Sequence, residues 1–160
     1  MPEVKIMNVS DDKKDVLWNY LQKYLYEMTA YYNDVMNPDG NYLYRYFDAY
    51  FEHEPGREAF FFIKDGEVIG FAMINTHSFD EREVDHCLAE FTIFPMYRGN
   101  GYAESALRLL LNFRPGHWQL KYFIKNDRGM RFWNKTLEPY QPIESNIDDL
   151  ERLVNFYFKV

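Results

Sequence analysis

The sequence predicts an α/β protein of the α+β kind, with a mixed, mostly antiparallel central sheet of six to seven strands flanked by about four helices. First, segments with alternating apolar residues are interspersed along the chain with segments of helical periodicity. Second, Asp65-Gly66 separates two apolar segments, which is typical of an antiparallel hairpin. Third, strand, helix and strand follow one another from residue 88 to residue 124, and such a unit requires parallel pairing.

The first half of the chain predicts a strand, two helices and the hairpin. Loose alternation over residues 4–9 indicates the strand, and Ser10 is placed to cap the helix that follows. Residues 42–51 are apolar on most sides and predict a second, short helix. The first helix carries a stripe at helical spacing, made of Leu17, Leu21, Tyr24, Met28 and Tyr31, and the hairpin strands cover residues 59–63 and 67–74.

The second half predicts strands at 88–94, 118–124 and 154–160, with a loop over residues 75–85 before them. Helical stripes indicate a helix over residues 101–113 and another that begins after the capping residue Asn126. The first of these stripes consists of Ala103, Ala106, Leu107, Leu110 and Leu111. A solvated turn is predicted at the acidic residues Asp148, Asp149 and Glu151.

Length and composition point to one domain, residues 1–160, with ample apolar content at 47% hydrophobic residues. The net charge of -7 and the lack of a basic stripe argue against a nucleic-acid partner. A single cysteine, Cys87, excludes an internal disulfide and favours a reducing compartment. With no signal-like or membrane-length apolar segment, we expect a cytoplasmic monomer or homodimer with no membrane partner.

The stretch from Glu90 to Ala103 predicts an anion-binding loop. Pro95 ends a strand because it has no amide for the ladder. Gly99 and Gly101 then allow the backbone to approach a ligand closely, and a helix begins behind them. The free amides of that helix N-terminus favour a phosphate, and Arg98 adds a positive charge beside it.

Two common phosphate loops do not fit these residues. A Walker loop requires Lys-Ser or Lys-Thr after a glycine run, and here Lys135-Thr136 follows Asn134 within a helical pattern. A dinucleotide fingerprint requires a third glycine, where this chain has Glu104.

The loop instead has the form Arg-x-x-Gly-x-Ala, and Ile93-x-Pro95-x-Tyr97 precedes it. In this form the stretch resembles the acetyl-coenzyme A loop of the GNAT superfamily of N-acetyltransferases. The predicted element order matches that superfamily along nearly the whole chain, which implies the GNAT fold. Pro115-Gly116-x-Trp118 is similar to a poorly characterised bacterial branch of predicted acetyltransferases.

The resemblance implies acetyl-CoA as cosubstrate and assigns roles to several positions. The amides of the loop would hold the pyrophosphate, and the strand before it would hold the pantetheine arm by backbone hydrogen bonds. Asn126 would fix that arm, and Trp133 would pack against its thiol end. The cofactor-binding candidates are Thr92, Ile93, Arg98, Gly99, Asn100, Gly101, Tyr102, Ala103, Asn126 and Trp133.

Acetyl transfer to an amine requires a base, and Glu90 is the candidate because burial near the thioester would raise its pKa toward a useful value. Alternation places it on the face opposite Ile93, whose amide is the candidate for polarising the carbonyl. The alternative for Glu90 is an exposed or salt-bridged strand residue. By resemblance, Tyr31 and Tyr32 lie where an amine acceptor binds, since relatives form the acceptor pocket between their first two helices.

Trp133 departs from the family pattern, because relatives place a tyrosine general acid there and an indole N–H is too weak an acid. Either solvent or another tyrosine protonates the leaving thiolate, or the protein is a coenzyme A sensor or partner-binding module without turnover. A third hypothesis is a domain that binds no nucleotide. Cys87 as a nucleophile is disfavoured against a buried apolar role, and the four scattered histidines predict no metal site.

Overall fold

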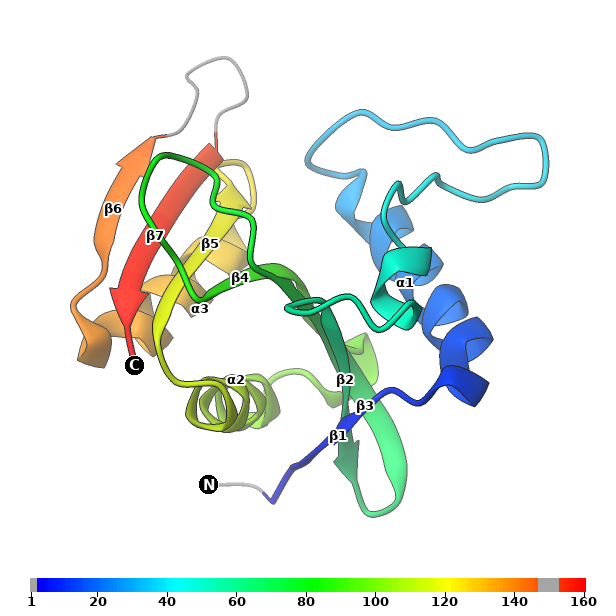
Figure 1. Cartoon of the computed structure of the whole chain (residues 1–160), viewed down its shortest axis with the longest axis horizontal. Coiled ribbons are helices and arrows are strands. Elements are labelled where there is room, and N and C mark those ends of the chain that lie inside the picture. The colour runs from blue at the N-terminus through cyan, green and yellow to red at the C-terminus, as the bar shows by residue number, and fades with distance from the viewer. Residues whose placement is uncertain (1–2, 147–152) are drawn as a thin grey trace.

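The computed structural model describes residues 3–146 and 153–160, which form one seven-stranded sheet with helices on both faces (Figure 1). The strands are β1 (Lys5–Asn8), β2 (Glu58–Lys64), β3 (Glu67–Asn75), β4 (His86–Ile93), β5 (His117–Phe123), β6 (Ile143–Asn146) and β7 (Leu153–Lys159). The α-helices are α1 (Lys14–Met28), α2 (Tyr102–Phe113) and α3 (Asp127–Leu137). None of the described helices has the length and apolar character needed to span a bilayer.

The strand order is β1-β2-β3-β4-β5-β7-β6, and all neighbours are antiparallel except β4 and β5. The predicted mixed, mostly antiparallel sheet is therefore confirmed. The hairpin between β2 and β3 is also confirmed, with Asp65 at φ 50° and Gly66 at φ 80°. Both values are left-handed, as a two-residue turn matched to the strand twist requires.

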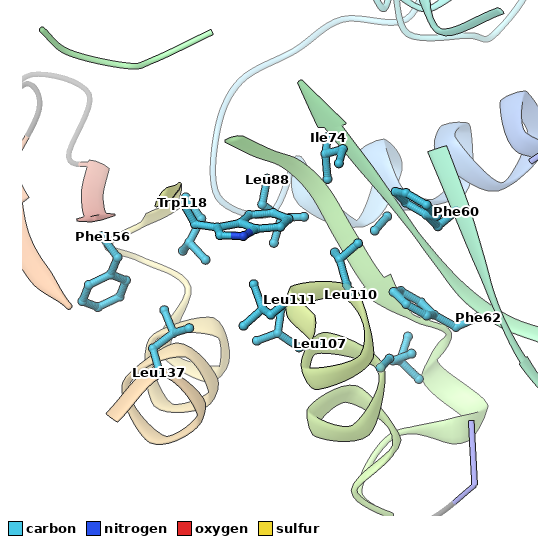
Figure 2. Packing of buried hydrophobic residues seen from close by; sticks show 14 of the residues in the cluster. Phe60, Phe62, Ile74, Leu88, Leu107, Leu110, Leu111, Trp118, Leu137 and Phe156 are labelled. Atoms are coloured by element: carbon cyan, nitrogen blue, oxygen red, sulfur yellow. The ribbon is translucent and has the colours of Figure 1, made fainter. Parts of the chain in front are cut away.

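Two apolar cores lie on opposite faces of the sheet. On one face, α1 packs against β2 and β3 through the buried residues Leu17, Leu21 and Leu25. On the other face, α2 and α3 pack against the middle of the sheet (Figure 2). Figure 2 shows Leu107, Leu110 and Leu111 of α2 among side chains of the strands, as the helical stripe predicts.

The segment from Tyr42 to Phe51 is not the predicted helix but an irregular stretch and one turn, followed by a short 3-10 helix, Asp48–Phe51. Tyr42, Phe47 and Tyr50 are nevertheless buried in the core beneath α1. Aromatic residues on most sides of a segment indicate burial without specifying its backbone, so the described residues form three α-helices where about four were expected. The predicted turn at Asp148, Asp149 and Glu151 lies outside the described residues.

Ser10 occupies the position before the first turn, but its side chain makes no capping hydrogen bond. Its hydroxyl donates to the carboxylate of Asp12 instead. The first helical turn, Asp11–Lys13, is of the 3-10 type, and α1 begins only at Lys14.

Strands β4 and β5 separate partway along their length, and this separation creates the site. They pair only where His86–Leu88 meets Trp118–Leu120. Beyond that point β4 continues to Ile93 along β3, while β5 continues to Phe123 along β7. The sheet is therefore open between residues 89–93 and residues 121–123.

Candidate active site

A cleft of about 500 Å³ occupies the opening between β4 and β5. Its walls come from the C-terminal part of α1, the glycine loop after β4, the start of α2, the end of β5 and one side of α3. The cleft thus reaches both faces of the sheet. Most of the predicted site residues line it, namely Tyr31, Tyr32, Glu90, Thr92, Ile93, Arg98, Gly99, Gly101, Ala103, Asn126 and Trp133.

Pairing with β3 fixes the direction of each β4 side chain. Glu90 lies opposite Met73 and Thr92 opposite Phe71, and both partners belong to the core beneath α1. Directly paired residues share a face, so Glu90 and Thr92 face α1. Ile93 belongs to the other core, on the side of α2 and α3. The predicted opposition of Glu90 and Ile93 is therefore confirmed.

A β-bulge in β4 precedes these residues. Leu88 pairs with Ile74 and Glu90 with Met73, which leaves Ala89 without a partner on β3. The extra residue places both Leu88 and Phe91 against the core on the α2 side, although they are three positions apart. It also turns Glu90 toward the α1 side of the open cleft.

Backbone groups of β4 face the cleft where β5 has separated. The Phe94 amide donates to the Ile69 carbonyl at 2.8 Å, so the N–H of Phe94 points toward β3, while its carbonyl accepts the Tyr97 amide in the turn that follows. Strand alternation then directs the N–H of Ile93 the other way, toward the opening, while its carbonyl accepts from Arg98 Nε. The Ile93 amide is thus positioned to donate to a ligand in the cleft.

The glycine loop leads into α2 with no side chain capping the helix. Gly99 and Gly101 both have φ of 81°, a conformation that favours glycine. A Cβ at Gly99 would meet no atom within 4 Å, so open space lies beside the loop. The amides of the first turn of α2, at Tyr102, Ala103 and Glu104, have no intrahelical carbonyl to bind.

The Arg98 guanidinium forms bonds within the protein and does not stand free beside the loop. Nη1 and Nη2 donate to the Glu27 carboxylate at 3.0 and 2.8 Å, and Nε donates to the Ile93 carbonyl at 2.7 Å. Nη2 also lies 3.2 Å from the Thr92 hydroxyl. Arg98 therefore joins the end of β4 to α1.

Two of the predicted cofactor-binding residues do not line the cleft. Asn100 is exposed, and its side chain donates to the Arg98 carbonyl at 3.2 Å. The Tyr102 ring packs edge-on against Tyr97. Only the backbone amides of these two residues are placed to contribute.

Glu90 is an acidic residue of the cleft whose surroundings strongly change its pKa. Its Oε2 atom is buried and has no hydrogen-bond partner among the described residues. Burial raises the pKa of this carboxyl to about 8, against a smaller lowering effect of nearby Lys121. Glu90 is thus neither exposed nor salt-bridged, and it is suited to exchange a proton near neutral pH.

Tyrosines surround Glu90 on the α1 side. The Tyr24 hydroxyl accepts a hydrogen bond from the Phe91 amide, and burial raises the pKa of Tyr24 well above its usual range. The Tyr32 ring stacks on Phe123 of β5, with centroids 4.8 Å apart, and burial raises its pKa to about 12. Both hydroxyls remain protonated at neutral pH and can donate hydrogen bonds.

The wall formed by α3 begins at Asn126, whose carboxamide oxygen accepts the Gly129 amide at 2.9 Å and caps the helix as predicted. The cap leaves its Nδ2 group for a ligand. Trp133 contacts Phe91 across the cleft, with ring centroids 5.6 Å apart. Arg128 and Lys135 also line this side.

Sequence reasoning assigned no role to Glu27, Lys121 and Phe123, although all three line the cleft. Alternation along the predicted strand places Lys121 and Phe123 on one face, but nothing local shows that β4 and β5 separate there. Cys87 lies outside the cleft, where its thiol contacts the His77 carbonyl and burial raises its pKa to about 12. No group of three potential ligands among the described residues could hold a metal ion.

The family model of the acetyltransferase (GNAT) family matches residues 18–137. An acetyltransferase from Thermus thermophilus superposes with a TM-score of 0.70 at 12% identity, covering 98% of this chain and 97% of the other. A GNAT-family acetyltransferase from Streptococcus agalactiae gives a TM-score of 0.71 at 16% identity, with coverages of 98% and 95%.

The PaiA N-acetyltransferase from Thermoplasma acidophilum, solved in complex with coenzyme A, gives a TM-score of 0.64 at 11% identity. Its alignment covers 99% of both chains. The chain matches no curated protein in sequence. The family match spans more than half of the chain, and the protein therefore belongs to the acetyltransferase (GNAT) family of acyltransferases.

Proposed function

We propose that residues 1–160 form one N-acetyltransferase domain that transfers the acetyl group of acetyl-CoA to a primary amine of a small molecule by direct attack. The observation that carries this proposal is the position of Glu90. Its carboxyl, whose Oε2 atom is buried without a hydrogen-bond partner among the described residues, faces the opening between β4 and β5, and the uncapped start of α2 lines the same cleft. A base and a phosphate-binding corner in one cleft suit acyl transfer from a phosphorylated thioester.

The residues of the cleft fit acetyl-CoA, which supplies an activated thioester when bound. The amides from Gly99 to Ala103 would hold its pyrophosphate, and the space beside Gly99 admits such a group. The Nδ2 group of Asn126 would hold the pantetheine arm, and the Ile93 amide would meet its thioester end, because the Ile93 carbonyl already accepts from Arg98. Binding of coenzyme A to the related PaiA enzyme supports this assignment.

Glu90 would accept the proton of the acceptor amine, directly or through one water, as the amine attacks. With a pKa near 8, the carboxylate form accepts this proton readily, and this form becomes the main one as the pH rises through 8. The Ile93 amide would donate to the carbonyl oxygen as negative charge develops on it. A fixed backbone dipole needs no reorganisation for this role.

Tyr24 is our candidate for protonating the departing thiolate, in place of the tyrosine that Trp133 replaces. Its hydroxyl lies at the Phe91 amide, beside the opening where the thiol end would lie. While its oxygen accepts from Phe91, its proton remains available to donate. A thiolate is a tolerable leaving group near neutral pH, so we expect a modest contribution from this donor.

A cytoplasmic location suits the single free thiol of Cys87, and we propose a monomer or homodimer.

The alternative function, a coenzyme A sensor without turnover, rests on Trp133. A thiol-release screen separates the two. Incubation of the protein with acetyl-CoA and a panel of amino acids, polyamines, aminoglycosides and peptides should release free thiol with at least one amine. Stabilisation of the protein by coenzyme A, without thiol release from acetyl-CoA in the presence of any of these amines, would favour the sensor.

A further inference from the structure

The two faces of the cleft differ, and the difference decides where an acceptor enters. The glycine loop, α2 and α3 line the side on which Ile93 packs. Glu90 faces the other side, toward α1. A cofactor held by the loop and by α3 therefore leaves the α1 side open to the second substrate.

Pairing along β5 shows which of its residues border that side. Trp118, Leu120 and Tyr122 belong to the core against α2 and α3. Lys121 alternates with them and therefore faces α1, as Glu90 does. The acceptor side thus presents two ionisable cleft residues from neighbouring strands, one acidic and one basic.

Lys121 is exposed and has no carboxylate partner among the described residues. Its ammonium lies 4.5 Å from the centroid of the Phe79 ring, and it is close enough to Glu90 to act on that carboxyl. The other charged pair on this wall, Arg98 and Glu27, is neutralised by its own bidentate contact. Within the described part of the chain, a cation without a carboxylate partner therefore lies at the rim, and a carboxyl lies deeper inside.

The remaining wall is apolar and aromatic. Met28 at the end of α1 and Tyr31 in the turn after it line this wall, and the stack of Tyr32 on Phe123 bridges from the segment after α1 to β5. Such a surface favours a substrate with an apolar or ring-bearing body over a long polyamine. A polycation would also be repelled by Lys121.

We propose that the acceptor is an amino-acid-like molecule, with a primary amine directed at Glu90, a carboxylate paired with Lys121 and an apolar side group against the aromatic wall. This inference rests on the proposed N-acetyl transfer. It names the substrate class of that same site.

Binding of the acetylated products provides the test, because these molecules lack the titrating amine. N-acetyl-L-phenylalanine and its amide differ only in the carboxylate, and calorimetric titration of each into the protein saturated with coenzyme A gives two dissociation constants. We expect the acid to bind about three- to tenfold more tightly than the amide, as suits a partly exposed ion pair. Lys121→Met should remove this preference, and Lys121→Glu should reverse it.

Lys125→Met is the matched control. It removes an exposed positive charge just beyond the end of β5 that does not line the cleft, so the preference for the acid should remain. Equal binding of acid and amide to the wild type, or an equal loss of preference in Lys125→Met, would overturn the inference.

The same pair of molecules before acetylation separates this inference from the proposed function. Thiol release with L-phenylalanine that exceeds release with phenethylamine, and that falls in Lys121→Met, supports both. Release with phenethylamine but not with the amino acid sustains acetyl transfer and overturns the carboxylate assignment. If none of the amines tested causes thiol release, the proposed function itself is overturned.

Discussion

The guanidinium of Arg98 forms a bidentate contact with the carboxylate of Glu27, 71 positions away in the sequence, at 2.8 and 3.0 Å. This contact joins the end of β4 and the glycine loop to the helix that forms the acceptor wall. Arg98 thus holds the loop against α1, and the Glu27 carboxylate already balances its charge.

A double-mutant cycle measures this pair. Arg98→Met and Glu27→Gln should each destabilise the protein, with a coupling of about 1 kcal/mol in urea unfolding, because the contact is partly shielded from solvent. Glu27→Gln leaves the loop backbone intact and should leave coenzyme A affinity almost unchanged. Equal loss of that affinity in both single variants would instead show that the ion pair is part of the cofactor site.

Gly99→Ala tests the glycine loop, with Gly66→Ala as a control of similar backbone strain. The two glycines have φ of 81° and 80°, and a Cβ added at either would have no atom within 4 Å. Each substitution should cost about 1 kcal/mol of stability from the left-handed backbone. Only Gly99→Ala should weaken coenzyme A binding, measured by calorimetry. A matching loss in Gly66→Ala would contradict the loop assignment.

Glu90→Gln tests the base through its pH dependence. Below pH 6 the wild-type carboxyl is protonated and cannot accept a proton, so the two proteins should have similar kcat/KM. The ratio of wild type to variant should rise with pH and level off above about 8, at about 100-fold. The acceptor's own titration cancels in the ratio. A ratio that is constant with pH would remove Glu90 as the base.

The same variant should be more stable than the wild type in alkaline solution. The folded-state pKa of Glu90 lies near 8 and its ordinary value is 4.5, so the folded protein holds a proton that the unfolded chain releases. Wild-type stability therefore falls as pH rises from about 4.5 to 8. Urea unfolding should show Glu90→Gln gaining about 1–4 kcal/mol at pH 8 relative to pH 4.5. No gain would mean that the carboxyl is solvated.

Tyr24→Phe should lower kcat about tenfold if its hydroxyl protonates the leaving thiolate. Adding Trp133→Tyr to that variant restores a phenol at the position used by relatives, and we expect part of the lost kcat to return. Steady-state kinetics with saturating acetyl-CoA provide the measurement. An unchanged kcat in Tyr24→Phe would assign this proton to solvent.

Local chemistry explains which features could be predicted from the sequence. Asp65-Gly66 and the apolar stripe of α2 each specify a backbone conformation within a few residues, and both predictions are confirmed. Residues 42–51 contain no such signal. Tyr42, Phe47 and Tyr50 can be buried whether the backbone is helical or turned, so the predicted helix is wrong there.

The candidate site was predictable where it follows the chain from Glu90 to Ala103. Alternation holds from Glu90 to Ile93 because the bulge at Ala89 lies before both. The parts that depend on distant contacts were not predictable. The partner of Arg98 comes from α1, and Lys121 reaches the cleft only because β4 and β5 separate.

Thiol release from acetyl-CoA, followed together with mass spectrometry of the amine, tests acetyl transfer in this cleft most directly. We predict release in equal molar amount to an N-acetylated product with at least one amine, and a strong reduction at pH 8 in Glu90→Gln. Tight coenzyme A binding with no product from any amine, or equal turnover by Glu90→Gln at that pH, would contradict it.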